Sequence, residues 1–250
     1  MALDMKKMME RKKALESKGG NNQFWRPQDG EQTIRIVPTA DGDPFKDYWF
    51  HYNLGSNPGF LSPKRNFGED CPLDSFVRNL WNGSDEDKRM AKKLSARQRF
   101  FAPVLVRGEE QLGVRVWGFG KQVYESLLNL VLNPEYGDIT DPDSGTDLVL
   151  TYGKPAGASF PQTNLTPRRR SSPLCDDGPE RCAELLEDIP DFDSLFAGSK
   201  KSYEEVQAML DEFLLGDSDA EEVSSETTKY NNNNTESNSV DKAFADLLGS

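Results

Sequence analysis

Residues 113–121 read GVRVWGFGK and set an arginine, a tryptophan, a phenylalanine and a lysine among three glycines. Glycine-rich stretches can cradle a nucleotide phosphate through their backbone N–H groups. A P-loop needs the pattern G-x-x-x-x-G-K-[ST], but Phe119 stands where the lysine must follow Gly118. The dinucleotide pattern G-x-G-x-x-G fails as well, because Val123 occupies the place of its third glycine. The segment therefore does not predict a phosphate-binding loop.

Alternation of side chains instead predicts a strand over residues 112–119. One face is aliphatic and suits a core, with Leu112, Val114 and Val116. The other face carries a cation and two rings, Arg115, Trp117 and Phe119. Two interpretations stay open at this point. Either the rings form a surface for a ligand, or they pack in a second core layer while the arginine extends its charged head to solvent.

Positive charge recurs beside aromatic residues in three further segments. Lys64 and Arg65 lie near two phenylalanines, and residues 168–170, all arginine, follow Phe160. A longer cluster precedes two phenylalanines and comprises Lys88, Arg89, Lys92, Lys93, Arg97 and Arg99. Single-stranded nucleic acid is bound by cationic grooves that follow the phosphates and by rings that stack on the bases. For any one segment, a solvated basic surface is the alternative.

Residues suited to catalysis are scarce. The only histidine is His51, and the sequence contains no G-x-S-x-G, H-E-x-x-H or P-loop pattern. The adjacent carboxylates Glu109 and Glu110 lie in an expected turn, where solvation accounts for them. The sequence therefore predicts a protein that is not an enzyme.

Charge is distributed unevenly along the 250 residues, whose net charge is -12. Residues 1–175 hold 25 Lys/Arg and 22 Asp/Glu, whereas residues 176–250 hold 5 Lys/Arg and 20 Asp/Glu. An acidic end on a mildly basic body is typical of an interaction tail. No stretch approaches 18 apolar residues, so no membrane span is expected. The three cysteines do not make a disulfide framework.

Periodicity predicts five strands and four helices. The expected strands cover residues 32–38, 44–54, 99–107, 112–119 and 147–153. The expected helices cover residues 70–83, 121–132, 178–190 and 201–216. The last helix begins with a capping box of Ser202 and Glu205, and Pro103 indicates an edge strand or a bulge. These elements indicate an α+β protein, mainly β. They fit an OB-type Greek-key barrel with added helices, and they would also fit other small α+β folds.

The domain organisation has three parts. Residues 1–20 form a basic arm with the cations Lys6, Lys7, Arg11, Lys12 and Lys13. Residues 21–216 form the OB-type core with a helical subdomain. Residues 217–250 are an acidic tail, polar enough to be expected disordered. The tail ends in an apolar pattern that suits a partner-binding helix, Val240, Phe244, Leu247 and Leu248.

Seven segments resemble, in order, the single-stranded DNA-binding, helix-destabilising protein family of T-even-type bacteriophages: QTIRIVP, PFKDYWFH, CPLDSF, RFFAPVLV, VRVWGFGKQVYESL, KSYEEV and VDKAFADLLG. The resemblance covers most of the chain. It implies cooperative, sequence-independent binding of single-stranded DNA during phage DNA replication, recombination and repair, in the cytoplasm of the infected bacterial host. It also implies that the arm mediates self-association along DNA. The tail is implied to recruit replication and recombination proteins and to compete with DNA for the basic groove.

Strand alternation and this resemblance together predict the DNA-contacting side chains. They are Lys64, Arg65, Lys92, Lys93, Arg97, Arg99, Phe101, Arg115, Trp117, Phe119, Lys121, Arg168, Arg169 and Arg170. A non-catalytic protein-interaction adaptor and an RNA-binding OB protein remain alternatives, since no residue pattern here identifies a reader of the 2′-OH.

The zinc site of the resembled family, one histidine and three cysteines, is the main departure. His51 and Cys71 match two of its positions, whereas Asp74 replaces the second cysteine of the C-P-x-C pair. A structural zinc ion requires four tetrahedral ligands, mostly N and S. The sequence therefore predicts neither zinc nor another cofactor. It predicts that aromatic packing holds this region, through Trp49, Phe60, Phe67, Phe76 and Trp81.

Overall fold

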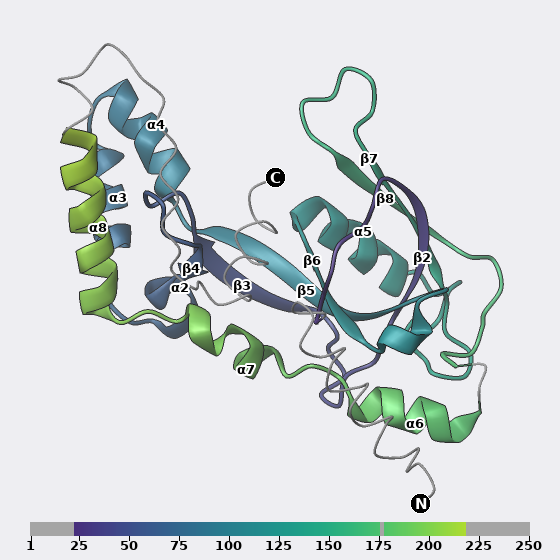
Figure 1. The fold of residues 1–250 in the computed structure, drawn as a ribbon. Helices are drawn as coiled ribbons and strands as arrows, with labels where there is room; N and C mark the ends of the chain where they lie inside the picture. The colour runs from purple at the N-terminus through teal and green to yellow at the C-terminus, as the bar shows by residue number, and fades with distance from the viewer. Residues whose placement is uncertain (1–22, 176–177, 219–250) are drawn as a thin grey trace, which may run out of the picture. The chain divides into compact units, whose positions relative to one another are not determined.

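The structure, a computed structural model, describes residues 23–175 and 178–218 (Figure 1). Within these residues the chain is a mixed α+β protein with eight strands and seven α-helices, which confirms the α+β class. They divide into two compact units. We call residues 23–47, 100–175 and 178–191 the sheet unit, and residues 48–99 and 192–218 the helical unit. The expected arm and nearly all of the expected tail lie outside the described residues.

Six strands follow one another across the sheet in the order β1-β6-β5-β2-β7-β8. They are β1 (Phe24–Trp25), β2 (Gly30–Ile36), β5 (Arg97–Val106), β6 (Arg115–Phe119), β7 (Leu148–Gly153) and β8 (Gln162–Pro167). Neighbours are antiparallel except for β1 and β6, which are parallel. The expected hairpin over residues 99–119 is confirmed by the antiparallel pairing of β5 and β6. The pairings of the described residues do not close this sheet into a barrel.

The core of the sheet unit lies where the expected helix packs on the strands. Helix α5 (Lys121–Val131) buries Leu127 completely and packs Val123, Tyr124 and Leu130 against the same cluster. Strands β2, β5 and β7 contribute aliphatic side chains to it, including Ile34, Ile36, Val104, Val106, Leu148 and Leu150. Side chains in these strands either alternate between apolar and polar or are continuously apolar, as expected for a sheet whose face is covered by a helix.

Pro103 lies in the middle of the sheet, so the edge position expected for it is wrong. Strand β5 has β6 on one side and β2 on the other. Val116, opposite Pro103 in β6, donates its N–H to the Gln23 carbonyl at 2.6 Å. The Pro103 carbonyl accepts from the Val37 N–H at 2.9 Å. A proline is tolerated here because its acceptor is used and the residue opposite bonds elsewhere.

The helical unit contains a short hairpin and five helices. Strand β3 (Lys46–His51), whose first two residues belong to the sheet unit, pairs with β4 (Phe60–Leu61). The helices are α2 (Pro63–Phe67), α3 (Pro72–Leu80), α4 (Asp85–Leu94), α7 (Phe192–Phe196) and α8 (Tyr203–Ser218). Helix α3 packs against both α4 and α8. Their shared core includes Leu73, Val77, Ala91, Leu94, Val206 and Leu210.

The expected capping box at the start of α8 is confirmed. Ser202 Oγ accepts from the Glu205 N–H at 3.2 Å, and Glu205 Oε2 accepts from the Ser202 N–H at 2.7 Å. Two expected helix ends are wrong. Helix α3 ends at Leu80 rather than at Gly83, and α8 continues through Gly216 to Ser218.

A smaller cluster forms where α6 (Pro179–Glu187) packs Leu185 against Leu105 and Leu174. Cys175 and Cys182 form a disulfide beside it, while Cys71 is free and buried. The number of cysteines indicated that there is no disulfide framework. A count alone cannot show that two of the three cysteines lie within bonding distance. None of the described helices is both long and apolar enough to cross a membrane.

Candidate nucleic-acid interface

Three rings expected to stack on bases are buried. Phe101 is 0% exposed, Trp117 1% and Phe119 4%, and the last two belong to the core of the sheet unit. The Trp117 ring lies 6.0 Å from that of Trp25 and 4.5 Å from that of Phe119, between centroids. The expectation that these rings are accessible is therefore wrong. The alternative of a second core layer is correct, because Val114, one position before Arg115, packs in the separate cluster with Leu105.

Arg115 is buried with these rings and does not present a free cation. It is 6% exposed, and its Nη2 lies 2.5 Å from Glu109 Oε2 in the turn between β5 and β6. A carboxylate at this distance neutralises the guanidinium locally. The expectation that Arg115 contacts a phosphate is therefore wrong, and Glu109, expected to be merely solvated, is its partner.

The predicted cations of the helical unit lie at its surface. Lys64 and Arg65 on α2 are exposed, as are Lys92, Lys93 and Arg97, and Arg99 is half-buried. Helix α4 begins with a capping box of Ser84 and Asp87 and has acids in its first turn and Lys92 and Lys93 in its last. Such charges stabilise a helix through its dipole, so the two lysines have a structural role as well as an exposed position.

One hollow gathers several of these groups. It has a volume of about 510 Å³ and is lined by Lys64, Arg65, Asp74, Val77, Arg78, Trp81, Ser95 and Ala96, which we call the cationic hollow. Trp81 is 47% exposed rather than packed as the sequence indicated, and Phe67 is 43% exposed. Phe60 is buried as expected, whereas Trp49 and Phe76 are partly buried. Sequence reasoning thus missed Arg78 and Trp81 as residues that line a surface hollow.

The arginines of residues 168–170 are exposed on the sheet unit, directly after β8. Phe160 is 71% exposed and lies with Lys154 in the loop between β7 and β8, at the opposite end of β8 from the arginines. Lys121, at the start of α5, is also exposed, and its Nζ lies 3.6 Å from Glu125 Oε1. An exposed pair of this kind contributes little, so Lys121 stays available to an anion.

A buried network fixes the segment that follows the three arginines. Arg35 Nε donates to Asp147 Oδ1 at 2.9 Å, and Arg107 Nη2 donates to the same oxygen at 2.9 Å. Arg35 also donates to Ser172 Oγ at 2.8 Å, and Arg107 donates to the Leu174 carbonyl at 2.8 Å and the Pro173 carbonyl at 2.7 Å. Burial raises the pKa of Asp147, but the hydrogen bonds from Arg107 and Arg35 outweigh it and lower the pKa overall.

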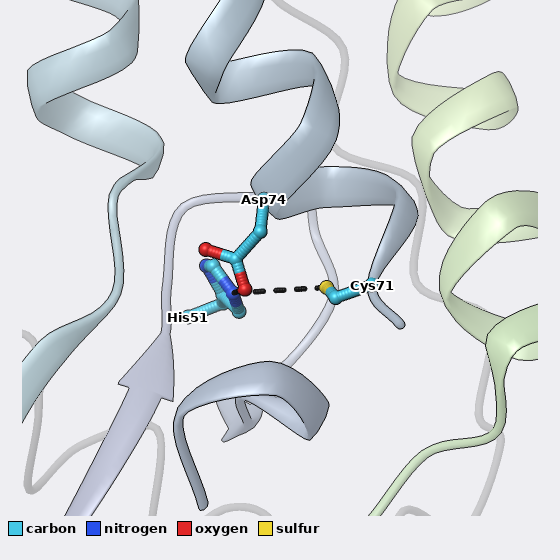
Figure 2. A group of neighbouring side chains, drawn as sticks. All are labelled: His51, Cys71 and Asp74. Atoms are coloured by element: carbon cyan, nitrogen blue, oxygen red, sulfur yellow. Dashed lines mark hydrogen bonds and ion pairs between the residues drawn. The ribbon is translucent and has the colours of Figure 1, made fainter. Parts of the chain in front are cut away.

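Three side chains that match or neighbour the expected zinc positions converge in the helical unit (Figure 2). His51 Nε2 lies 3.4 Å from Asp74 Oδ2 and 3.9 Å from Cys71 Sγ. His51 Nδ1 lies 3.0 Å from the Leu94 carbonyl, and Ser62 Oγ donates to Asp74 Oδ2 at 3.1 Å. Every polar group in the cluster therefore has a partner within the chain.

These residues do not complete a structural zinc site. The cluster supplies one imidazole nitrogen, one sulfur and one carboxylate, whose Oδ2 accepts from Ser62 and contacts His51. A structural zinc site needs four ligands, and the described residues bring only three donor groups of metal-binding type together here. The geometry instead resembles an ion pair. Burial lowers the pKa of His51, but the bonds to Asp74 and Cys71 outweigh it and raise the pKa to about 9.

The His51–Asp74 pair predicts that stability falls in mild alkali. The pKa of His51 in the folded chain, about 9, exceeds the unperturbed value of about 6.5. Its contribution is therefore complete below pH of about 6.5 and is lost as the pH rises through 9. We expect a loss on the order of 3 kcal/mol in the free energy of unfolding, measured by urea unfolding in EDTA between pH 6.5 and pH 10.

The His51→Gln variant is the control for this titration, because glutamine keeps a polar side chain without an ionisable ring. It should unfold with a flatter pH profile than the wild type over the same interval. Equal slopes for the two proteins would show that His51 is not the titrating group.

Comparison with known proteins supports the interpretation of these surfaces. A search of the curated proteins finds no match to the chain. A family model described as gp32 DNA binding protein like matches residues 28–214, well over half of the sequence. That family consists of DNA-binding proteins and not of enzymes, which agrees with the lack of a catalytic pattern in the sequence. The chain therefore belongs to the gp32-like family of DNA-binding proteins.

Proposed function

We propose that this protein binds single-stranded DNA cooperatively and without sequence preference, in phage DNA replication, recombination and repair. Membership of the gp32-like family supports DNA binding. The observation that carries the proposal further is the cationic hollow, where an exposed indole stands among three cations. Cations bind the phosphates of any sequence, and a ring stacks on any base, so neither group reads sequence.

Single strands are favoured over duplex by the exposed rings. In a duplex the bases are stacked on one another, whereas an unpaired base is free to stack on Trp81 or Phe160. The cations alone would also attract duplex DNA, since phosphate contacts act on both forms. The proposed preference therefore depends on the rings, and the predicted cations Lys64, Arg65, Lys92, Lys93, Arg97 and residues 168–170 supply affinity.

Strand order supports an OB-type core. Strands β2, β5 and β6 follow one another, and β7 returns to lie on the other side of β2. The spatial order β7-β2-β5-β6 is compatible with a Greek key, in which the fourth strand lies beside the first, although β3, β4 and three helices separate β2 from β5 along the chain. OB-folds are five-stranded, partly open Greek-key barrels, and β8 provides the fifth strand by pairing with β7.

The parts outside the described residues complete the proposal from their sequence. The arm of residues 1–20, with Lys6, Lys7 and residues 11–13, is proposed to mediate self-association along DNA. The acidic tail of residues 217–250 is proposed to recruit replication and recombination proteins through its apolar end. Host cytoplasm is the compartment that this function implies. Binding is proposed to need no zinc, since the His51 cluster is satisfied by its own hydrogen bonds.

Competition binding tests the proposed function. We expect labelled oligo-dT to be displaced by unlabelled single strands of any sequence, and far less by a duplex of equal length, in fluorescence anisotropy. Affinity should fall with salt, because each phosphate contact on a single strand contributes a slope of about -0.7 in log K against log salt. Equal competition by duplex, or preferential competition by RNA, would contradict the proposal.

A further inference from the structure

We infer that the cationic hollow of the helical unit is a seat for one nucleotide of single-stranded DNA, with the base on the Trp81 indole and the phosphate against Lys64, Arg65 and Arg78. This inference rests on the proposed function and assigns part of the DNA binding to a defined site on the helical unit. It adds Trp81 and Arg78, which neither the family match nor strand alternation singles out, to the predicted contacts Lys64 and Arg65.

The indole is held in place from its backbone. Trp81 is the C-cap residue that follows α3, and its N–H donates to the Val77 carbonyl at 3.2 Å. The turn that follows is closed by bonds from Asn82 to Asn79 at 3.1 Å and from Gly83 to Leu80 at 3.0 Å. Helix α4 begins immediately afterwards, capped by Ser84. The backbone of Trp81 is thus held at a corner between two helices, which reduces the backbone entropy lost when a ligand packs on the ring.

The ring surface itself is available. Trp81 is 47% exposed, and in the part of the chain that the structure describes no other ring and no cation packs on it. Trp49, by contrast, is already covered by the Arg65 guanidinium, 5.1 Å from its ring centroid. A large apolar ring kept half in water at a rigid corner is typical of a binding anchor rather than of a core residue.

The cations around Trp81 lack acidic partners. Within residues 48–99 and 192–218, three other lysines pair with carboxylates, Lys88 with Asp85 at 3.5 Å, Lys200 with Glu69 at 2.8 Å and Lys201 with Glu205 at 3.7 Å, whereas Lys92 and Lys93 do not. Lys64 and Arg78 form no ion pair among these residues. Asp74 is the only acid lining the hollow, and its Oδ2 accepts from Ser62 and contacts His51. The hollow is therefore left with a net positive charge that a phosphate can neutralise.

The dimensions and chemistry of the hollow fit a nucleotide. Its volume of about 510 Å³ lies within the range of about 300–1,000 Å³ for small-molecule sites. Val77 and Ala96 offer apolar contact, and Ser95 adds a polar group. An acidic peptide would also be attracted by the cations, but it carries aromatic rings at only some positions, whereas every nucleotide joins a phosphate to a planar base. The presence of Trp81 among the cations favours a nucleotide.

Substitutions at the hollow test the inference in the full-length chain, with oligo-dT as the probe in fluorescence anisotropy. Trp81→Ala should weaken binding about 5- to 150-fold, the range for losing one stacked base. Trp81→Phe should restore most of the affinity, because phenylalanine keeps a ring. Arg78→Gln should weaken binding and reduce the salt slope by about 0.7, the loss of one phosphate contact.

Two matched controls separate this seat from general surface effects. Tyr203→Ala removes an aromatic side chain of similar exposure, 50%, on α8, and Lys88→Gln removes one charge from α4 outside the hollow. Both should bind oligo-dT within about two-fold of the wild type. If the wild type binds while Trp81→Ala and Arg78→Gln match these controls, the seat is wrong and the proposed function stands. If the wild type does not bind oligo-dT, the proposed function itself is wrong.

Discussion

Replacing Trp117 with alanine is expected to lower the free energy of unfolding by about 3–5 kcal/mol. The ring is 1% exposed and packs against Trp25 and Phe119 in the core of the sheet unit. Truncation removes its buried apolar surface and leaves a cavity that the neighbouring strands cannot fill completely. Urea unfolding followed by circular dichroism measures the loss. This result would differ from the sequence-based expectation, in which the same change weakens DNA binding and leaves the fold intact.

The matched comparison is Trp81→Ala, which removes the same side chain from a half-exposed position. Its stability should change by no more than about 0.5–1 kcal/mol, since surface substitutions away from a core are usually near neutral. A Trp117→Ala variant with the wild-type midpoint of unfolding and weakened DNA binding would contradict the assignment of Trp117 to the core and of Trp81 to the DNA-binding surface.

Replacing Asp147 with alanine is the second large effect, expected to cost about 3–5 kcal/mol of stability. The carboxylate bridges Arg35, which is fully buried, and Arg107. Without it, the buried Arg35 guanidinium loses its ion-pair partner. Leaving a buried charge without that partner costs more free energy than the intact pair contributes to stability. Because the pKa of Asp147 is lowered in the folded chain, the contribution is present above its unfolded pKa and is lost as the pH falls. Urea unfolding at neutral pH measures the loss.

Asp143→Ala is the control for this change. Asp143 is an exposed carboxylate in the same connection between α5 and β7 and forms none of the bonds to the two arginines. Its loss should leave stability within about 0.5 kcal/mol of the wild type. Equal destabilisation by the two substitutions would indicate that overall charge, rather than the buried pairing, is responsible.

Most of the regular elements follow from local sequence patterns. Alternation in residues 32–38 and 147–153 and the apolar stripe of residues 121–132 correspond to β2, β7 and α5. Elements with few residues or no apolar period were missed, such as β1, which has two residues and pairs in parallel with β6. Strand β8 was missed because QTNLTP lacks an apolar alternation strong enough to stand out from a loop.

The site could be predicted only in part, because alternation separates two faces of a strand without showing what covers each. Trp117 and Phe119 were assigned to the open face of β6, but Trp25 and the rest of the sheet-unit core cover it. That covering comes from residues far apart in sequence. The surface cations were easier to predict, since long charged side chains are rarely buried without a partner. Arg115 is the exception, and its partner Glu109 supplies the reason.

Trp81 shows the opposite limitation. In sequence it lies near the end of the expected helix 70–83 and was expected to pack with other aromatic residues, whereas the structure places it at an exposed corner. Its proposed role depends on α2 and α3, which bring Lys64, Arg65 and Arg78 into the same hollow. In the case of Asp74, the sequence showed correctly that a cysteine was missing but not that Ser62 and His51 would engage the carboxylate.

Photocrosslinking to oligo-dT containing 5-iodo-deoxyuridine tests most directly whether unpaired bases contact the exposed rings while the buried rings hold the fold. The bound complex is irradiated, digested and mapped by mass spectrometry. We predict crosslinks on peptides at Trp81 and Phe160 and none at Trp117 or Phe119. Crosslinks confined to Trp117 and Phe119 would contradict the account, because those rings could then be reached by DNA only if the sheet-unit core opened.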